Sequence, residues 1–188
     1  VRSLERAIAS VIRKIIVLNI KEVQNADFKI SVKKNDIPKY LGVETFDSTE
    51  KEKGKQIGVV TGLAYTEYGG DILPIEVTYF KGKGQLGAVP KDGPSAGIAI
   101  TIALISAFSK KPVSGDIAMT GEVTLRGNAL AIGGLREKSL AALRNGVTTI
   151  IVPKDNERDV SELPDEVKNN MNILFMTCVD DAVKVILQ

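Results

Sequence analysis

A serine and a lysine in this sequence occupy positions that suit hydrolytic chemistry. Ser95 lies in "VPKDGPSAGIAI" (89–100), where loop residues are followed by a long apolar run. Pro94 suits the first turn of a helix, because its missing N–H would have no partner there, so the pattern places Ser95 in the first turn of a buried helix. Free N–H groups and the positive end of the helix dipole can hold an oxyanion there. Alternatively, Ser95 is an ordinary residue at the beginning of a helix, and the residues alone favour this second interpretation.

The residues around Ser95 fit either interpretation. Asp92 can cap the expected helix from two residues before its first turn. Gly93 and Gly97 have no side chains and leave room for a substrate backbone to approach.

A nucleophilic serine needs a base, and the sequence contains no histidine. The remaining candidate is a lysine whose pKa is low enough for the amine to be neutral. Lys138, in "IGGLREKSLAALRNG" (132–146), falls in the first turn of an expected helix, on the same side as Leu135 and Ala142. Apolar neighbours and the positive helix end both disfavour the ammonium form. An ordinary lysine with its stem along apolar surface is the alternative, and periodicity alone favours it.

The hydrophobic pattern predicts the elements that would position these residues. Residues 3–19 form an amphipathic pattern, and Asp36 and Gly42 can begin and end a short second helix. After a polar linker, the chain alternates β-rich runs with helical patterns, which predicts a mixed α/β or α+β fold. The expected segments are the linker 46–55, a hairpin 57–66 and 71–80, a loop 81–87, the buried helix after Ser95, short strands within 116–134, a helix to Gly146, a strand 147–153, an acidic helical stretch 156–163, a strand 172–177 and a helix 180–188.

Composition excludes several classes of protein. The longest apolar run, 98–108, is far shorter than the roughly 20 residues that span a bilayer, and the first residues do not resemble a signal peptide, so a cytoplasmic protein without membrane contact is expected. A single cysteine, Cys178, excludes an internal disulfide and is expected in the core. The net charge of +2 does not indicate a basic surface for nucleic acid, so DNA binding is possible but has no support in the sequence.

Nucleotide and metal sites are not expected either. The glycine loops "GKGQLG" and "IGGLREK" do not fit a phosphate-binding pattern, so the chain is predicted to lack ATPase activity. The acidic residues between Asp155 and Glu166 are interpreted as a solvated surface without a metal.

Three linked motifs resemble one known family. "PKDGPSAG", then "AMTGEVTLRGNALAIGGLREKSLAA", then "VPKDNERD" closely resemble the proteolytic domain of the Lon family of ATP-dependent serine proteases. The similarity is dense over 91–159, continues from Gly58 to the C-terminus, and includes an opening helix similar to the end of the family's ATPase module. The resemblance implies that 1–50 is a helical fragment of an AAA+ ATPase module plus linker. It implies that 51–188 is a Lon-type serine protease domain of short strands and packed helices.

The resemblance also implies roles for individual residues. Ser95 matches the nucleophile and Lys138 the general base of a Ser-Lys dyad. Thr120 matches a threonine that hydrogen-bonds near the lysine, and Asp92 lies in a loop that rearranges between inactive and active forms. With Gly93, these two residues are expected to form the environment of the oxyanion or the dyad.

The resemblance also implies partners, and the sequence departs from the family pattern at one place. Arg2 matches a nucleotide-sensing arginine, and ATP and magnesium are expected for the full-length protein, with no cofactor in this chain. Unfolded proteins or peptides are the implied substrates, and six copies form a ring. Members of the family carry a helix and a histidine-containing strand between "KGKGQLG" and "AVPKDG", where this sequence has no such segment.

Two non-catalytic interpretations stay open beside the protease. The chain could be a Lon-like domain that serves as an assembly or DNA-repair scaffold, or a regulatory subunit that packs on an ATPase ring. Neither gives a reason for both Ser95 and Lys138.

Overall fold

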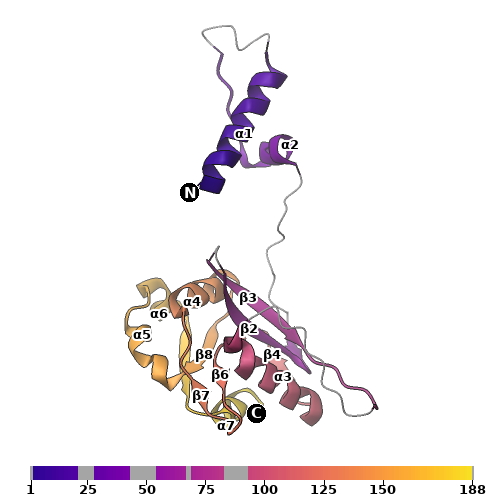
Figure 1. Cartoon of the computed structure of the whole chain (residues 1–188), viewed down its shortest axis with the longest axis vertical. Helices are drawn as coiled ribbons and strands as arrows, with labels where there is room; N and C mark the ends of the chain where they lie inside the picture. The colour runs from indigo at the N-terminus through magenta and orange to yellow at the C-terminus, as the bar shows by residue number, and fades with distance from the viewer. Residues whose placement is uncertain (1, 21–27, 43–53, 67–68, 83–92, 188) are drawn as a thin grey trace. The chain divides into compact units, whose positions relative to one another are not determined.

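The computed structural model of the chain describes residues 2–20, 28–42, 54–66, 69–82 and 93–187 (Figure 1). The chain divides into two compact units, Val1–Ser48 and Thr49–Gln188. Most of the expected linker and the end of the expected loop 81–87 lie outside the described residues. Among the described helices, none is long and apolar enough to cross a membrane.

The first unit contains two helices. Helix α1 (Arg2–Leu18) confirms the amphipathic pattern, and a short turn, η1 (Lys34–Asp36), leads into α2 (Ile37–Leu41). The predicted cap is wrong in one respect: the Asp36 carboxylate makes no capping bond to α2 and accepts the Lys33 N–H at 2.9 Å. Gly42, with φ of 87°, ends α2 as expected.

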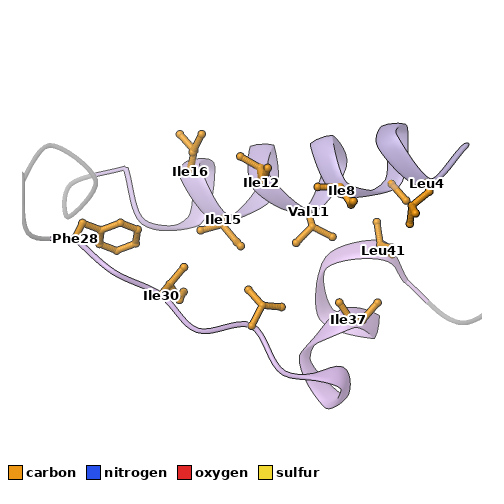
Figure 2. Close-up of a pocket in the computed structure, with 12 residues that line it drawn as sticks. Leu4, Ile8, Val11, Ile12, Ile15, Ile16, Phe28, Ile30, Ile37 and Leu41 are labelled. Atoms are coloured by element: carbon orange, nitrogen blue, oxygen red, sulfur yellow. The ribbon is translucent and has the colours of Figure 1, made fainter. Parts of the chain in front are cut away.

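An apolar groove lies between α1 and the chain that follows it within this unit. Its volume is about 620 Å³. Figure 2 shows Val11 and Ile15 pointing from α1 toward the segment that carries Ile30 and Ile37. The groove is lined by apolar residues throughout: Leu4, Ala7, Ile8, Val11, Ile12, Ile15, Ile16, Phe28, Ile30, Val32, Ile37 and Leu41. Contacts within the unit cover the apolar face of α1 only partly, since Ile8 and Ile12 remain about half exposed.

The second unit is built on a five-stranded sheet in the order β3-β2-β5-β8-β9. Strands β2 (Val59–Thr66) and β3 (Gly69–Glu76) form the predicted antiparallel hairpin, with Val59 opposite Glu76 and Thr66 opposite Gly69. The other neighbours in the sheet pair in parallel. Their bounds are β5 (Ile117–Met119), β8 (Thr149–Pro153) and β9 (Asn172–Met176).

Helices cover both faces of this sheet. Successive strand residues point to opposite faces, so Ile151 of β8 packs in one core with α3 (Gly97–Ser109) and α7 (Val179–Ile186), whereas Ile150 and Val152 pack in another with α4 (Leu135–Arg144) and α6 (Asp165–Asn170). The mixed α/β prediction is confirmed. The acidic stretch forms α5 (Glu157–Ser161), and α6 had no counterpart in the predicted elements.

Short elements complete the unit and connect the sheet to the helices. Helix α3 is largely buried as predicted, although Phe108 near its end is 65% exposed. Cys178 was expected in the core but is only half-buried, at the start of α7. The short elements are β1 (Lys55–Gln56), η2 (Pro94–Ala96), β4 (Val113–Ser114), β6 (Glu122–Val123), β7 (Ala129–Leu130) and η3 (Lys154–Asn156).

Candidate active site

The fold brings Ser95 and Lys138 together, although they are 43 positions apart in the chain. Lys138 Nζ lies 3.0 Å from Ser95 Oγ, which is a hydrogen-bond distance. Ser95 lies in the η2 turn, directly before α3, and Lys138 lies in the first turns of α4. Both residues therefore stand at helix beginnings, as the sequence pattern predicted.

The segment that carries Ser95 is held by backbone hydrogen bonds to the end of β5. Gly121 N–H donates to the Ser95 carbonyl at 2.9 Å, and Ile98 N–H donates to the Gly121 carbonyl at 3.0 Å. Gly97 allows this close approach, because a Cβ there would lie 3.0 Å from the side chain of Val123. The nucleophile candidate is thus fixed to the sheet on both sides of its turn.

The beginning of α4 is fixed by a left-handed glycine and by a buried amide. Gly134 has φ of 68°, and its carbonyl accepts the Lys138 N–H at 3.0 Å. The Asn156 side chain, 1% exposed, accepts the Ile132 N–H at 3.0 Å and donates to the Ile132 carbonyl at 2.9 Å. These bonds position the loop from which α4, and with it Lys138, begins.

Lys138 is buried, and its environment favours the neutral amine. The side chain is 2% exposed, beside the buried residues Leu135 and Ala142 of the same helix. Loss of hydration on burial lowers the pKa of Lys138 below its ordinary value, and the negative charge of Glu122 acts in the opposite direction. A neutral amine has a lone pair and can accept a proton, so burial makes Lys138 suitable as a base.

Thr120 links the two residues. Its Oγ1 lies 3.2 Å from Lys138 Nζ, from which it accepts, and 3.3 Å from the Ser95 carbonyl, to which it donates. The residue is fully buried at the end of β5. A single hydroxyl therefore orients the amine and holds the serine segment.

A pocket of about 360 Å³ opens onto the dyad. Gly93 contributes to its wall, as expected for a residue beside the reacting groups, whereas Asp92 lies outside the described residues. The lining residues are Ala64, Tyr65, Gly93, Pro94, Ser95, Glu122, Gly133, Gly134 and Lys138.

Sequence reasoning missed three residues of this region. Tyr65 and Glu122 line the pocket, and Asn156 bonds to Ile132 in the loop before α4. Glu122 stands directly after Thr120 and Gly121 in the quoted motif, so its nearness to Thr120 was the available signal. Asn156 was predicted only as part of the acidic helical stretch 156–163, because its two bonds to Ile132 join parts of the chain 24 positions apart and leave no local signal.

The described residues contain no cluster of three or more histidine, cysteine, aspartate or glutamate side chains that could hold a metal ion. The reacting groups that the pocket exposes are the hydroxyl of Ser95 and the amine of Lys138, with the carboxylate of Glu122 beside them. This set is chemically suited to acyl transfer, in which the hydroxyl attacks a carbonyl carbon and the amine takes the proton.

Known proteins resemble the chain over its whole length. Proteins named Lon protease are 42% identical in Mycoplasma mycoides, 40% in Dictyoglomus thermophilum and 39% in Clostridium acetobutylicum. The alignments cover 100%, 100% and 98% of this chain, and 29% of each relative. The chain thus spans less than a third of the length of these relatives.

The comparisons also locate a gap. The Mycoplasma alignment spans 235 residues against the 188 of this chain, a difference of 47. The family match comes in two parts that meet at residues 86–87, which is where the sequence pattern departs from the family. The two parts are residues 31–87 and 86–188, and the matching family is described as the Lon protease (S16) C-terminal proteolytic domain. Through this match, which covers most of its residues, the chain belongs to the Lon protease family.

Proposed function

We propose that this chain is the peptide-hydrolysing part of an ATP-dependent serine endopeptidase, with Ser95 as nucleophile and Lys138 as general base. The observation that supports the proposal most directly is the 3.0 Å contact between Ser95 Oγ and the buried Lys138 Nζ. A surface lysine would be protonated near neutral pH and could not take the serine proton. Membership of the Lon protease family supports the same chemistry.

The proposed reaction proceeds through an acyl-enzyme. Ser95 Oγ bonds to the peptide carbonyl carbon while its proton moves to the Lys138 amine, and the carbonyl oxygen becomes an oxyanion. The N-terminal end of the Ser95 helix, with its positive dipole, favours that negative charge. When the C–N bond breaks, the Lys138 ammonium gives its proton to the leaving amine, and Ser95 is left as an ester.

Hydrolysis of the ester repeats the same proton transfers. Water bonds to the ester carbonyl carbon and gives a proton to Lys138. The bond to Ser95 Oγ then breaks, the ammonium returns the proton to that oxygen, and the new carboxylic acid leaves. Thr120 keeps the amine directed toward Ser95 in both halves, because it holds Lys138 Nζ and the Ser95 carbonyl together.

The test is hydrolysis of a fluorogenic peptide by the chain and by two variants. Ser95→Ala and Lys138→Gln should each lower kcat/KM by about three orders of magnitude or more, as removal of a member of a catalytic dyad does. Ser161→Ala and Lys184→Gln change the same residue types elsewhere in the unit and should keep the wild-type rate. Wild-type turnover in either dyad variant would contradict the mechanism, whereas no hydrolysis by the unmutated chain would favour the scaffold interpretation.

The wider roles of the protein belong to the same proposal. Its substrates are unfolded proteins or peptides, its location is the cytoplasm, and six full-length copies form a ring that uses ATP and magnesium. Residues 1–50 would be the end of the ATPase module, and 51–188 the protease domain. The sequence of this chain contains no phosphate-binding loop, and no step of the hydrolysis above involves nucleotide. The mass of the purified full-length protein in solution tests the ring.

A further inference from the structure

The pocket contains a second charged side chain that the Ser-Lys mechanism does not use. Glu122, in the two-residue strand β6, lines the pocket together with Ser95 and Lys138 and is half-buried there. It makes none of the salt bridges recorded among the described residues. A partly desolvated carboxylate beside a buried amine has a stronger electrostatic effect than the same pair in water.

The backbone around Glu122 is firmly placed relative to the dyad. The two residues before it, Thr120 and Gly121, both bond to the Ser95 carbonyl. On its other side, β6 pairs with β7, with Glu122 opposite Leu130. The carboxylate is therefore attached to the same hydrogen-bonded segment that fixes Ser95 and Lys138.

Few other titratable groups face Lys138. Strand β2, which packs against α4, contributes the phenol of Tyr65 to the pocket, whereas β3, α5 and α6 contribute no described residue to the lining. The titratable side chains that line the pocket are thus Tyr65, Glu122 and Lys138. Among these, Glu122 carries the only carboxylate, so it supplies the negative charge that acts on Lys138.

The proposed reaction requires Lys138 to be neutral at one step and protonated at another. The amine must be neutral before Ser95 attacks, which burial favours, and it must carry the proton once Ser95 has bonded to the carbonyl. Glu122 acts against burial and raises the pKa of Lys138. A charge that stabilises the ammonium acts mainly when the ammonium is present, in the intermediates.

We propose that Glu122 is a positioning residue for the dyad, whose carboxylate stabilises the ammonium form of Lys138 while Ser95 is bonded to the substrate carbonyl. This inference rests on the proposed function. It assigns Glu122 no proton transfer and no bond to the substrate. Its effect is electrostatic, so charge and not side-chain shape is the property that matters.

Glu122→Gln keeps the size of the side chain and removes its charge, so it should change the reaction in two opposite ways. The acid limb of the kcat/KM profile should move to lower pH, because Lys138 loses its proton more readily. The plateau at high pH should fall, because the ammonium formed during attack is less stable. The ratio of kcat/KM at pH 6.5 to that at pH 8.5 should rise roughly two- to fivefold.

Two further variants serve as controls for this test. Glu137→Gln removes a carboxylate one position from Lys138 in the chain, yet Glu137 does not line the pocket, so its pH profile should match the wild type. Glu122→Asp keeps the charge and should restore most of the wild-type profile. A Glu122→Gln variant slowed equally at every pH, or an equal shift in Glu137→Gln, would overturn the proposal.

A spectroscopic titration separates this proposal from the proposed function. In the Ser95→Ala background, the ¹³Cε resonance of Lys138, assigned by its loss in Lys138→Gln, reports protonation without any turnover. The midpoint should fall on Glu122→Gln and stay unchanged on Glu137→Gln. An unchanged midpoint in Glu122→Gln refutes the role of Glu122 even if the peptide is hydrolysed. A lowered midpoint without hydrolysis would show that Glu122 stabilises the ammonium of Lys138 and would place the failure in the proposed function.

Discussion

At the scale of single residues, the burial of Lys138 favours its proposed role as a base and disfavours the stability of the fold. A buried lysine is costly to the fold, because its ammonium form loses hydration. The same cost lowers the pKa of Lys138 and makes the amine a base. Sites of this kind reduce the stability of the protein in exchange for reactivity.

The cost of Lys138 to the fold should depend on pH. In the unfolded chain the pKa of Lys138 is near its ordinary 10.5, and in the folded chain it is lower. Between these two values the unfolded state binds more protons, so the stability of the wild type rises with pH across this window. The penalty is greatest below the folded pKa and disappears toward pH 10.5.

Lys138→Met tests this linkage by removing the charge from a side chain of similar length. Its free energy of unfolding relative to the wild type should be highest near neutral pH and fall as the pH rises toward 10.5. Urea denaturation at several pH values measures the difference. Lys184→Met, at a side chain 75% exposed, is the matched control and should show no such trend. A difference independent of pH for Lys138→Met would refute the linkage.

At the scale of elements, the position of Lys138 depends on the contact between β3 and α4. A Cβ at Gly70 of β3 would overlap the carbonyl oxygen of Glu137 in α4, so the two backbones touch where Gly70 has no side chain. Arg144 Nη2 donates to the Gly70 carbonyl at 3.0 Å and fastens the other end of the helix to the same residue. The hairpin therefore sets the distance between α4 and the sheet.

Gly70→Ala should push α4 away from β3 and weaken both folding and catalysis. Overpacking of this kind costs about 1–3 kcal/mol of stability, and a displaced Lys138 would lose its hydrogen-bond distance to Ser95. Thermal denaturation and peptide hydrolysis measure the two effects. Gly82→Ala is the control, because a Cβ there meets its nearest atom at an ordinary 3.8 Å. Wild-type stability in Gly70→Ala would mean that the contact relaxes freely.

The longer elements could be predicted from the sequence, since they extend over eight or more residues. The hairpin carries two β-rich runs around a turn, α3 is a continuous apolar run, and α4 and α7 carry helical patterns. Helix α6 has six residues with one buried, Val167, too few for a recognisable period. The Asp36 cap was wrong because a carboxylate at that position can bond backward to Lys33 as well as forward.

The candidate site was predictable in its residues more than in its geometry. Periodicity could place Ser95 and Lys138 at helix beginnings, but only the family pattern paired them, because a contact between residues 43 positions apart leaves no local signal. Glu122 belongs to a strand of two residues, which is too short to show alternation. Its part in the pocket is a consequence of tertiary packing.

At the scale of the whole molecule, the groove of the first unit presents apolar side chains that remain exposed. Helix α1 leaves Leu4 65%, Ile8 52% and Ile12 51% exposed. A contiguous apolar surface of this kind binds apolar dyes and promotes association. Figure 2 shows that the lining comes from both α1 and the segment leading to α2. Dye binding to the groove would therefore require this unit to be folded.

The double variant Ile8→Glu and Ile12→Glu should lower the fluorescence of bound anilinonaphthalene sulfonate by roughly half or more, because two charges enter the apolar lining. The dye is an anion, so the control must change the charge equally. Arg13→Glu lowers the net charge by the same amount at an exposed position outside the lining and should leave most of the fluorescence. Equal losses in both variants would show that charge alone governs dye binding.

The bridge through Thr120 also bears on when the proposed dyad can first form during synthesis of the chain. The three groups of the bridge stand at positions 95, 120 and 138, separated by steps of 25 and 18 residues, and α4 packs in one core with β8, which follows it in the chain. A chain growing from its N-terminus exposes the serine first and can complete the pair only after α4 and the strand β8 that packs with it have emerged. In a nascent chain the proposed dyad therefore cannot form before Lys138 has been synthesised, 43 positions after Ser95.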